Sequence, residues 1–105
     1  MQKIQVSYPK ETERLKTLLQ VTKSSERQHE VGTAFLLKGT SMPDLGVSTH
    51  RKHEVSIILE GKLETTSGGE TVILKTGDIV SIPEGEAQSS KVLEDTKLIY
   101  IFFHE

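Results

Sequence analysis

The sequence contains no cysteine, which excludes disulfides, thiolate metal sites and cysteine nucleophiles. It also lacks a long hydrophobic run, because the longest ones, residues 57–59 and 98–103, are far shorter than a membrane span. Neither sign of charge dominates, since 13 Lys and Arg stand against 15 Asp and Glu, giving a net charge of -2. This balance argues against a dedicated partner for nucleic acid or anionic membranes. Without the apolar core of a signal peptide near Met1, we expect a soluble, cytoplasmic protein.

The length of 105 residues predicts one domain over residues 1–105 with a single core. From residue 31 onward, turn sequences interrupt the chain at short intervals, at Gly61, Gly68-Gly69, residues 75–78 and residues 83–85. Such spacing is typical of an all-β sandwich or barrel and not of alternating strands and helices. We expect strands over residues 31–37, 55–59, 71–74, 79–82, 90–93 and 97–103, with residues 94–96 as the last turn.

The N-terminal part has a different pattern. Residues 2–8 alternate polar and apolar side chains, which predicts a short strand. Residues 10–20 combine early acidic residues with Leu15, Leu18 and Leu19 at helical spacing, so we expect a short amphipathic helix there. The polar residues 22–30 are predicted to form a loop. The N-terminal strand and helix together occupy about residues 2–20.

The last predicted strand, residues 97–103, is apolar on both of its faces. One face is expected to fill the core, and the other needs a cover. The predicted N-terminal helix is short, so we expect a second copy of the chain to provide that cover, in a homodimer.

Two segments of the chain carry a resemblance to a known family. In the first, residues 46–61, Glu54 stands seven residues before Gly61. In the second, residues 77–88, Gly77 is followed after five residues by Pro83, and Gly85 comes next but one. Fifteen residues separate Gly61 from Gly77. Together the segments resemble the two motifs of the cupin superfamily, in the compact form of small single-domain cupins.

The resemblance covers about residues 31–103 and implies a cupin-type antiparallel β-barrel, also called a double-stranded β-helix or jelly roll. It also implies a metal site built from two histidines and a glutamate of the first motif and a histidine of the second. Counted back from Glu54, these positions carry His50 and Ser48, and the position in the second motif carries Gln88. Two of the four ligand positions are therefore kept, and the other two carry a hydroxyl and an amide.

Strand geometry adds its own expectation about this site. Alternation places Ser48, His50, Lys52 and Glu54 on one face of a strand, continued by Ser56. His53 would point outward unless a bulge intervenes. A first-row divalent metal such as Fe, Mn, Ni or Zn usually takes three or more imidazole or carboxylate ligands. His50 and Glu54 supply two, Gln88 adds a carbonyl oxygen, and His53 joins them only if the strand is distorted.

Several functions fit this pattern. The first is a small-molecule pocket in the barrel mouth, where His50 and Glu54 act as an acid–base pair and Gln88, Lys52, Ser48 and Ser56 line the wall. The second, implied by metal-retaining cupins, is a metal-dependent dioxygenase, isomerase or lyase that uses His50 and Glu54. The third is a binding or sensory module without chemistry, similar to the cupin of ethanolamine-utilisation operons, which also departs from the histidine pattern. In a fourth interpretation, His50 and Glu54 only bond each other, as a remnant of an ancestral site. A purely structural subunit that acts through its outer sheet is a fifth.

Overall fold

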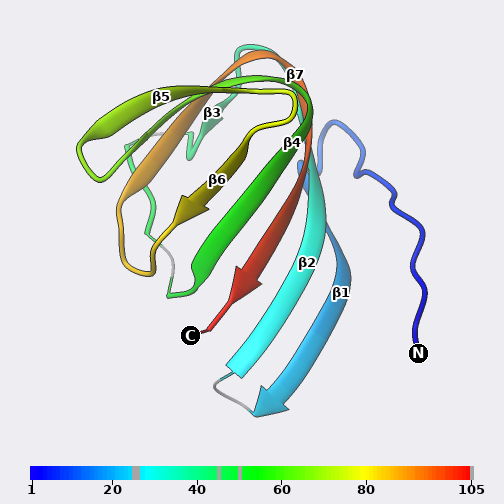
Figure 1. Cartoon of the computed structure of the whole chain (residues 1–105). Helices are drawn as coiled ribbons and strands as arrows, with labels where there is room; N and C mark the ends of the chain where they lie inside the picture. Colours follow the sequence, from blue (N-terminus) through cyan, green and yellow to red (C-terminus); the bar gives the residue numbers. More distant parts are fainter. Residues whose placement is uncertain (25–26, 45, 50, 105) are drawn as a thin grey trace.

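The computed structural model describes residues 1–24, 27–44, 46–49 and 51–104 of the chain (Figure 1). These residues form antiparallel strands and no helix. The strands are β1 (Leu15–Ser24), β2 (Arg27–Leu36), β3 (Ser41–Met42), β4 (His53–Ser67), β5 (Glu70–Lys75), β6 (Ile79–Ile82) and β7 (Gln88–Phe103). The all-β, antiparallel prediction is confirmed.

Two long strands, β4 and β7, build the fold because each takes part in two layers. In the first layer, the C-terminal half of β7 pairs with β2 and with the N-terminal half of β4, and β1 and β6 lie at the edges. In the second layer, the other halves of β4 and β7 pair with each other, flanked by β5 and β3. The two layers curl over one another in the manner of a jelly roll (Figure 1).

Both long strands bend at a corner between the two layers, where their register shifts. Gly61 has a φ of 110° there, and a Cβ atom at this position would overlap the carbonyl oxygen of Asp95 and the backbone of Thr96. The hydroxyl of the fully buried Thr96 donates to the carbonyl oxygen of Glu94 at 2.8 Å and accepts the N–H of Lys62 at 3.1 Å. The corner therefore requires glycine both for its φ and for its space.

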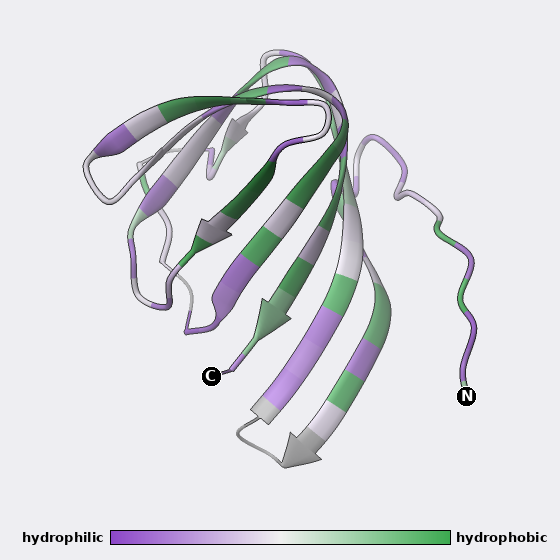
Figure 2. Cartoon of the chain, viewed as in Figure 1, coloured by the Kyte–Doolittle hydropathy of each residue, from purple (hydrophilic) through white to green (hydrophobic). Residues whose placement is uncertain are grey.

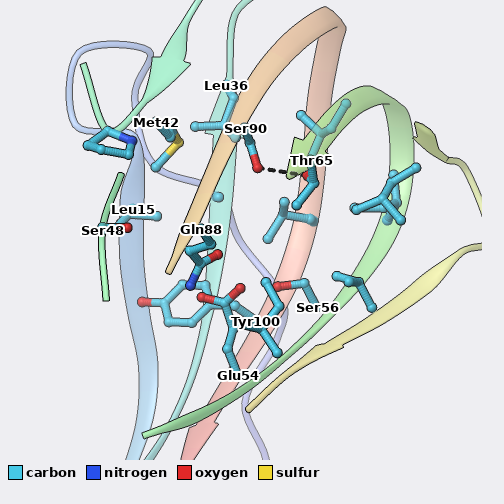
Figure 3. Close-up of a pocket in the computed structure, with 18 of the residues that line it drawn as sticks. Leu15, Leu36, Met42, Ser48, Glu54, Ser56, Thr65, Gln88, Ser90 and Tyr100 are labelled. Atoms are coloured by element: carbon cyan, nitrogen blue, oxygen red, sulfur yellow. Dashed lines mark hydrogen bonds between the residues drawn. The ribbon is translucent and has the colours of Figure 1, made fainter. Parts of the chain in front are cut away.

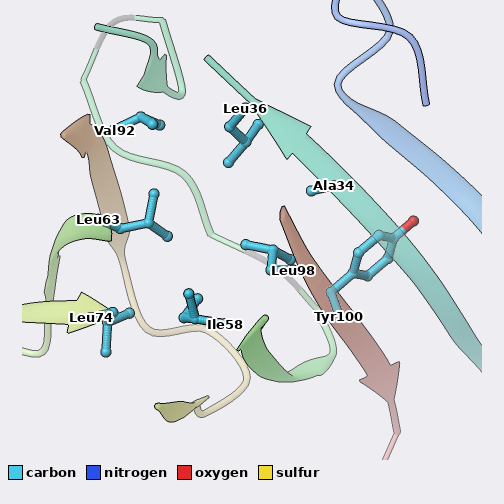
Figure 4. Close-up of a cluster of buried hydrophobic side chains, with 8 residues drawn as sticks. All are labelled: Ala34, Leu36, Ile58, Leu63, Leu74, Val92, Leu98 and Tyr100. Carbon is cyan, nitrogen blue, oxygen red and sulfur yellow. The ribbon is translucent and has the colours of Figure 1, made fainter. Parts of the chain in front are cut away.

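The core fills the space between the layers and consists of apolar side chains from both (Figure 4). Its members are Ala34, Leu36, Ile58, Leu63, Leu74, Val92, Leu98 and Tyr100. Along β4 and β7, hydrophobic stretches are separated by more hydrophilic residues (Figure 2). In β4 the buried positions change from Ser56 and Ile58 to Leu63 and Thr65, so their parity changes across the corner. The irregular register at the corner keeps both halves of the strand facing one core.

The predicted helix over residues 10–20 is wrong. A turn occupies residues 11–13, and β1 begins at Leu15 and pairs with β2 from there. The register of that pairing shifts between Thr17 and Leu19. This irregularity interrupts the two-residue alternation of the strand, so leucines whose spacing resembles that of a helix still fit into β1. Pairing with β2 thus prevails over local helix propensity.

Other boundaries also differ from the predictions. Part of the predicted loop over residues 22–30 belongs to the β1–β2 hairpin. Residues 2–8 form no assigned strand, although the carbonyl oxygen of Ser7 accepts a hydrogen bond from the hydroxyl of Thr33 at 2.6 Å. The predicted strands 90–93 and 97–103 belong to one strand, β7. Residues 94–96 do not form the predicted turn, because the strand continues through them and bends there at the corner. Strand β6 has the predicted bounds, and β3 was not predicted.

Candidate functional site

A cavity of about 240 Å³ lies between the two layers, and every strand contributes at least one side chain to its wall. Most of this wall is apolar. Leu15, a residue that is 47% exposed, lies at its rim, whereas Ile58 and Leu98 are buried in it. The polar side chains of the wall are Ser48, Glu54, Ser56, Thr65, Gln88, Ser90 and Tyr100. A mostly apolar cavity with a few polar groups is the usual form of a small-molecule site.

Four polar residues, Ser48, Glu54, Ser56 and Gln88, form what we call the polar end of the cavity. Alternation along β4 turns Glu54 and Ser56 to the inside, as it does Ile58. Gln88 is the first residue of β7, and its backbone exchanges two hydrogen bonds of 2.8 Å with that of Ser48. Figure 3 shows the Gln88 amide and the Glu54 carboxyl group pointing toward the same part of the cavity.

The Gln88 side chain stands out in this group because it is buried and incompletely satisfied. The residue is 8% exposed, and its Nε2 atom has no hydrogen-bond partner among the described residues. A buried N–H donor without a partner costs about 1–3 kcal/mol. The Nε2 atom is itself covered by neighbouring atoms, so this donor stays unsatisfied by the described residues within the wall of the cavity.

The remaining polar groups of the wall are bonded to protein partners. Thr65 of β4 and Ser90 of β7 share a hydroxyl–hydroxyl bond of 2.7 Å. The Tyr100 hydroxyl donates to Oε2 of Glu30 at 2.9 Å, and the Thr17 hydroxyl donates to the same oxygen at 3.1 Å. Burial, followed by the hydrogen bond to Glu30, raises the pKa of Tyr100 to about 12. The phenol therefore stays protonated at neutral pH and donates its hydrogen bond to Glu30.

The ring of Tyr100 lies directly against the backbone of β2. A Cβ atom on Gly32 would overlap the end of this ring, so the absence of a side chain at Gly32 makes room for it. The rings of Tyr100 and Phe102 lie 5.0 Å apart in a tilted arrangement. The residues that hold the Tyr100 hydroxyl, Thr17 and Glu30, were missed from the sequence, because they fall in segments predicted as helix and loop.

The structure brings together four of the predicted site residues, namely Ser48, Glu54, Ser56 and Gln88. Lys52 does not line the cavity. His53 faces away from it: its Nε2 atom lies 2.5 Å from the Ser81 hydroxyl, and its ring stacks on Phe103 at 4.9 Å. This position does not support His53 as a metal ligand that shares a site with Glu54, because neighbouring strand residues point to opposite faces. His50 lies outside the described residues.

A divalent metal is the cofactor that the two-motif resemblance implies. In the part of the chain that the structure describes, no three histidine, aspartate or glutamate side chains gather into a possible metal site. The polar end supplies one carboxylate from Glu54, with an amide and two hydroxyls. First-row divalent metals usually need three or more imidazole or carboxylate donors. The described donor set does not fit such a metal.

The rolled fold agrees with the family that the sequence matches. The model of the cupin domain matches residues 36–104, well over half of the chain. The chain belongs to the cupin family. Within this cupin, the family match includes all of β4, β5, β6 and β7 and the polar positions of the cavity.

Solved structures and a curated relative show what this cupin is similar to. A conserved protein of unknown function from Streptococcus pyogenes shares 19% identity, with a TM-score of 0.72 over 95% of this chain and 81% of that one. A putative ethanolamine utilization protein, EutQ, from Salmonella typhimurium shares 24% identity, with a TM-score of 0.59 over 85% and 67%. These likenesses show the fold.

The acetate kinase EutQ of Escherichia coli is 33% identical over 48 residues, which make up 46% of this cupin and 21% of that protein. This cupin thus aligns with about a fifth of the curated relative. No helix in the described ranges is long and apolar enough to cross a membrane.

Proposed function

We propose that this cupin binds a small molecule in the cavity between its two layers. The observation that supports the proposal is the cavity itself, whose mostly apolar wall carries four polar side chains, Ser48, Glu54, Ser56 and Gln88, at one end. Such a combination of an apolar wall and a few polar groups is the usual form of a small-molecule site.

The size of the cavity supports a compact ligand. A volume of about 240 Å³ corresponds to about eight water molecules at about 30 Å³ each. Pockets for drug-sized ligands start at about 300 Å³. We therefore infer a molecule of on the order of ten non-hydrogen atoms, and not a polymer segment.

Binding without metal chemistry is the form of this function that we favour. A metal-dependent dioxygenase, isomerase or lyase needs a set of metal ligands, and the described polar end supplies only the Glu54 carboxylate together with neutral groups. Acid–base chemistry by His50 and Glu54 stays a prediction from the sequence.

The test compares two tryptophan variants of strand β1. Leu15→Trp places a large ring at the rim of the cavity, where the native residue is 47% exposed. Val21→Trp is the matched control, because Val21 is 45% exposed on the same strand and does not line the cavity. We expect small aromatic and aliphatic probes to shift the amide NMR signals of wild type and of V21W, with binding at least tenfold weaker in L15W. Equal binding by both variants would place the ligand outside the cavity and contradict the proposal.

We also propose that two copies of this cupin associate through the outer face of β7. Ile99, Ile101 and Phe103 point to that face and are only half-buried in the single chain. Covering this apolar surface would favour a symmetric dimer. Ile101→Glu should convert the dimer to a monomer in sedimentation experiments, whereas Val72→Glu, on the partly exposed strand β5, should not. A wild-type protein that stays monomeric at high concentration would contradict the dimer.

A further inference from the structure

The wall of the cavity narrows the kind of ligand. We propose that this cupin takes a molecule with a hydrocarbon body, such as a benzene ring with a short alkyl chain, in preference to a sugar or another polyol. The inference rests on the proposed binding function and adds the chemical class of the ligand.

Most of the wall that a ligand would touch is hydrocarbon. Buried aliphatic side chains reach it from both layers, on β2, β4, β5 and β7, and they include Leu36, Ile58, Leu63, Leu74 and Leu98. Apolar surface gains free energy when it leaves water, roughly in proportion to the area that is covered. A hydrocarbon body is therefore stabilised by its contacts with both layers.

Away from the polar end, the few polar groups of the wall already bond to protein partners. Thr65 and Ser90 share a hydrogen bond of 2.7 Å, and Figure 3 shows this pair apart from Glu54. The hydroxyl of Tyr100 donates to Glu30, a residue that does not line the cavity. This part of the wall therefore offers little hydrogen bonding to a ligand.

Sugars and other polyols do not match such a wall. They carry hydroxyl groups around the whole molecule, so they cannot confine them to the polar end of the cavity. Each hydroxyl that is buried without a partner weakens binding by about 5-fold to 150-fold. A molecule with several hydroxyls would lose more affinity in this way than it gains from covering its carbon atoms.

The volume of the cavity sets the length of the hydrocarbon body. An apolar cavity of about 150 Å³ takes up benzene, whereas the cavity of this cupin measures about 240 Å³. The additional space accommodates a short alkyl chain on the ring. Each buried methylene group strengthens binding about fourfold, so affinity should rise with chain length until the space is filled.

The experiment uses two series of probes, each titrated into the full chain and followed by amide NMR shifts. In the first series, from benzene through toluene and ethylbenzene to propylbenzene, we expect Kd to fall about fourfold with each carbon. In the second series, cyclohexanol should bind at least tenfold more tightly than cyclohexane-1,3,5-triol, and inositol should bind more weakly still.

One substitution links the first trend to the cavity. Ala34 lies in the wall and is 1% exposed, so Ala34→Val adds two methyl groups where the alkyl chain would lie. Propylbenzene should then bind at least tenfold more weakly, while benzene keeps most of its affinity. The matched control Ala87→Val changes an exposed residue outside the wall and should alter neither. If A34V does not fold, because added methyl groups overpack the core, Leu15→Trp at the rim takes its place.

The outcomes separate this inference from the proposed function. If none of the probes binds, or if L15W binds propylbenzene as tightly as wild type does, the binding function and the ligand class are both overturned. If L15W weakens binding but the triol or inositol binds as tightly as cyclohexanol, or affinity does not rise along the alkyl series, the binding function stands and the ligand class is wrong. A rise with chain length that A34V removes, together with a loss for the triol, supports both.

Discussion

Replacing Gly61 by alanine should destabilise this cupin more than an alanine at any ordinary turn. Gly61 has a φ of 110°, in the region that L-residues disfavour by about 1–2 kcal/mol. The new Cβ would also overlap the carbonyl oxygen of Asp95 and the Cα of Thr96, which are backbone atoms that cannot rotate away. Forcing an extra methyl group into a filled space costs about 1–3 kcal/mol more. The two effects together predict a loss of about 2–5 kcal/mol.

A control is available in the turn that precedes β6. Gly77 has a similar φ of 92°, but a Cβ built there meets nothing within 4 Å. Gly77→Ala should therefore show the backbone cost alone, about 1–2 kcal/mol. The difference between the two variants isolates the steric part of the corner.

The assay is urea and thermal unfolding followed by circular dichroism. For a domain of this size, each kcal/mol lowers Tm by about 4–8 °C, so G61A should lose at least about 10 °C and G77A roughly half as much. Because natural domains have only about 5–15 kcal/mol of stability, G61A is also expected to express poorly at 37 °C. Equal losses for the two variants would refute the steric argument at the corner.

Three further predictions concern other parts of the molecule. The folded-state pKa of Tyr100, about 12, lies above its unfolded value near 10, so the contribution of Tyr100 to the unfolding free energy should be constant below pH 10 and should fall as pH rises toward 12; denaturant titrations of wild type and of Tyr100→Phe between pH 9 and 12 check this, since the variant should lose this part of the dependence. Thr33→Val removes the hydrogen bond to Ser7, which should cost about 1 kcal/mol and speed proteolytic cleavage before residue 10, whereas equal cleavage rates would contradict the contact. Untagged protein expressed with Fe, Mn, Ni and Zn should hold much less than one equivalent of metal by elemental mass spectrometry, and a full equivalent of one metal would overturn binding without metal.

The sequence predicted those parts of the fold that are determined by residues close together in the chain. Strand β6 could be predicted because three of its four residues are β-branched and apolar and because it lies between two glycine turns. The predicted N-terminal helix was wrong because Leu15, Leu18 and Leu19 have a spacing that a regular strand lacks and that a register shift in β1 accommodates. Only the ladder with β2, formed by residues further along the chain, decides between the two structures there.

The candidate site likewise contains residues that the sequence predicted and residues that it missed. Glu54 and Gln88 were found because motif spacing names their positions, and both line the cavity. The bond between Tyr100 and Glu30 joins residues 70 positions apart in the chain. Neither periodicity nor motif spacing predicts such a hydrogen bond, because its geometry depends on how β1, β2 and β7 pack together.

Because β4 and β7 run through both layers, the two halves of this cupin share the same pair of strands. Neither layer can therefore open without loosening the strands that hold the other, and we expect unfolding to be a single cooperative step. The pairs that join these strands close long stretches of chain, from Ser67 with Gln88 to His53 with Phe103, which should make folding slow for such a small domain. A ligand bound between the layers would slow amide hydrogen exchange in both layers at once. Ligand binding should therefore be detectable as slower exchange at amides far from the cavity.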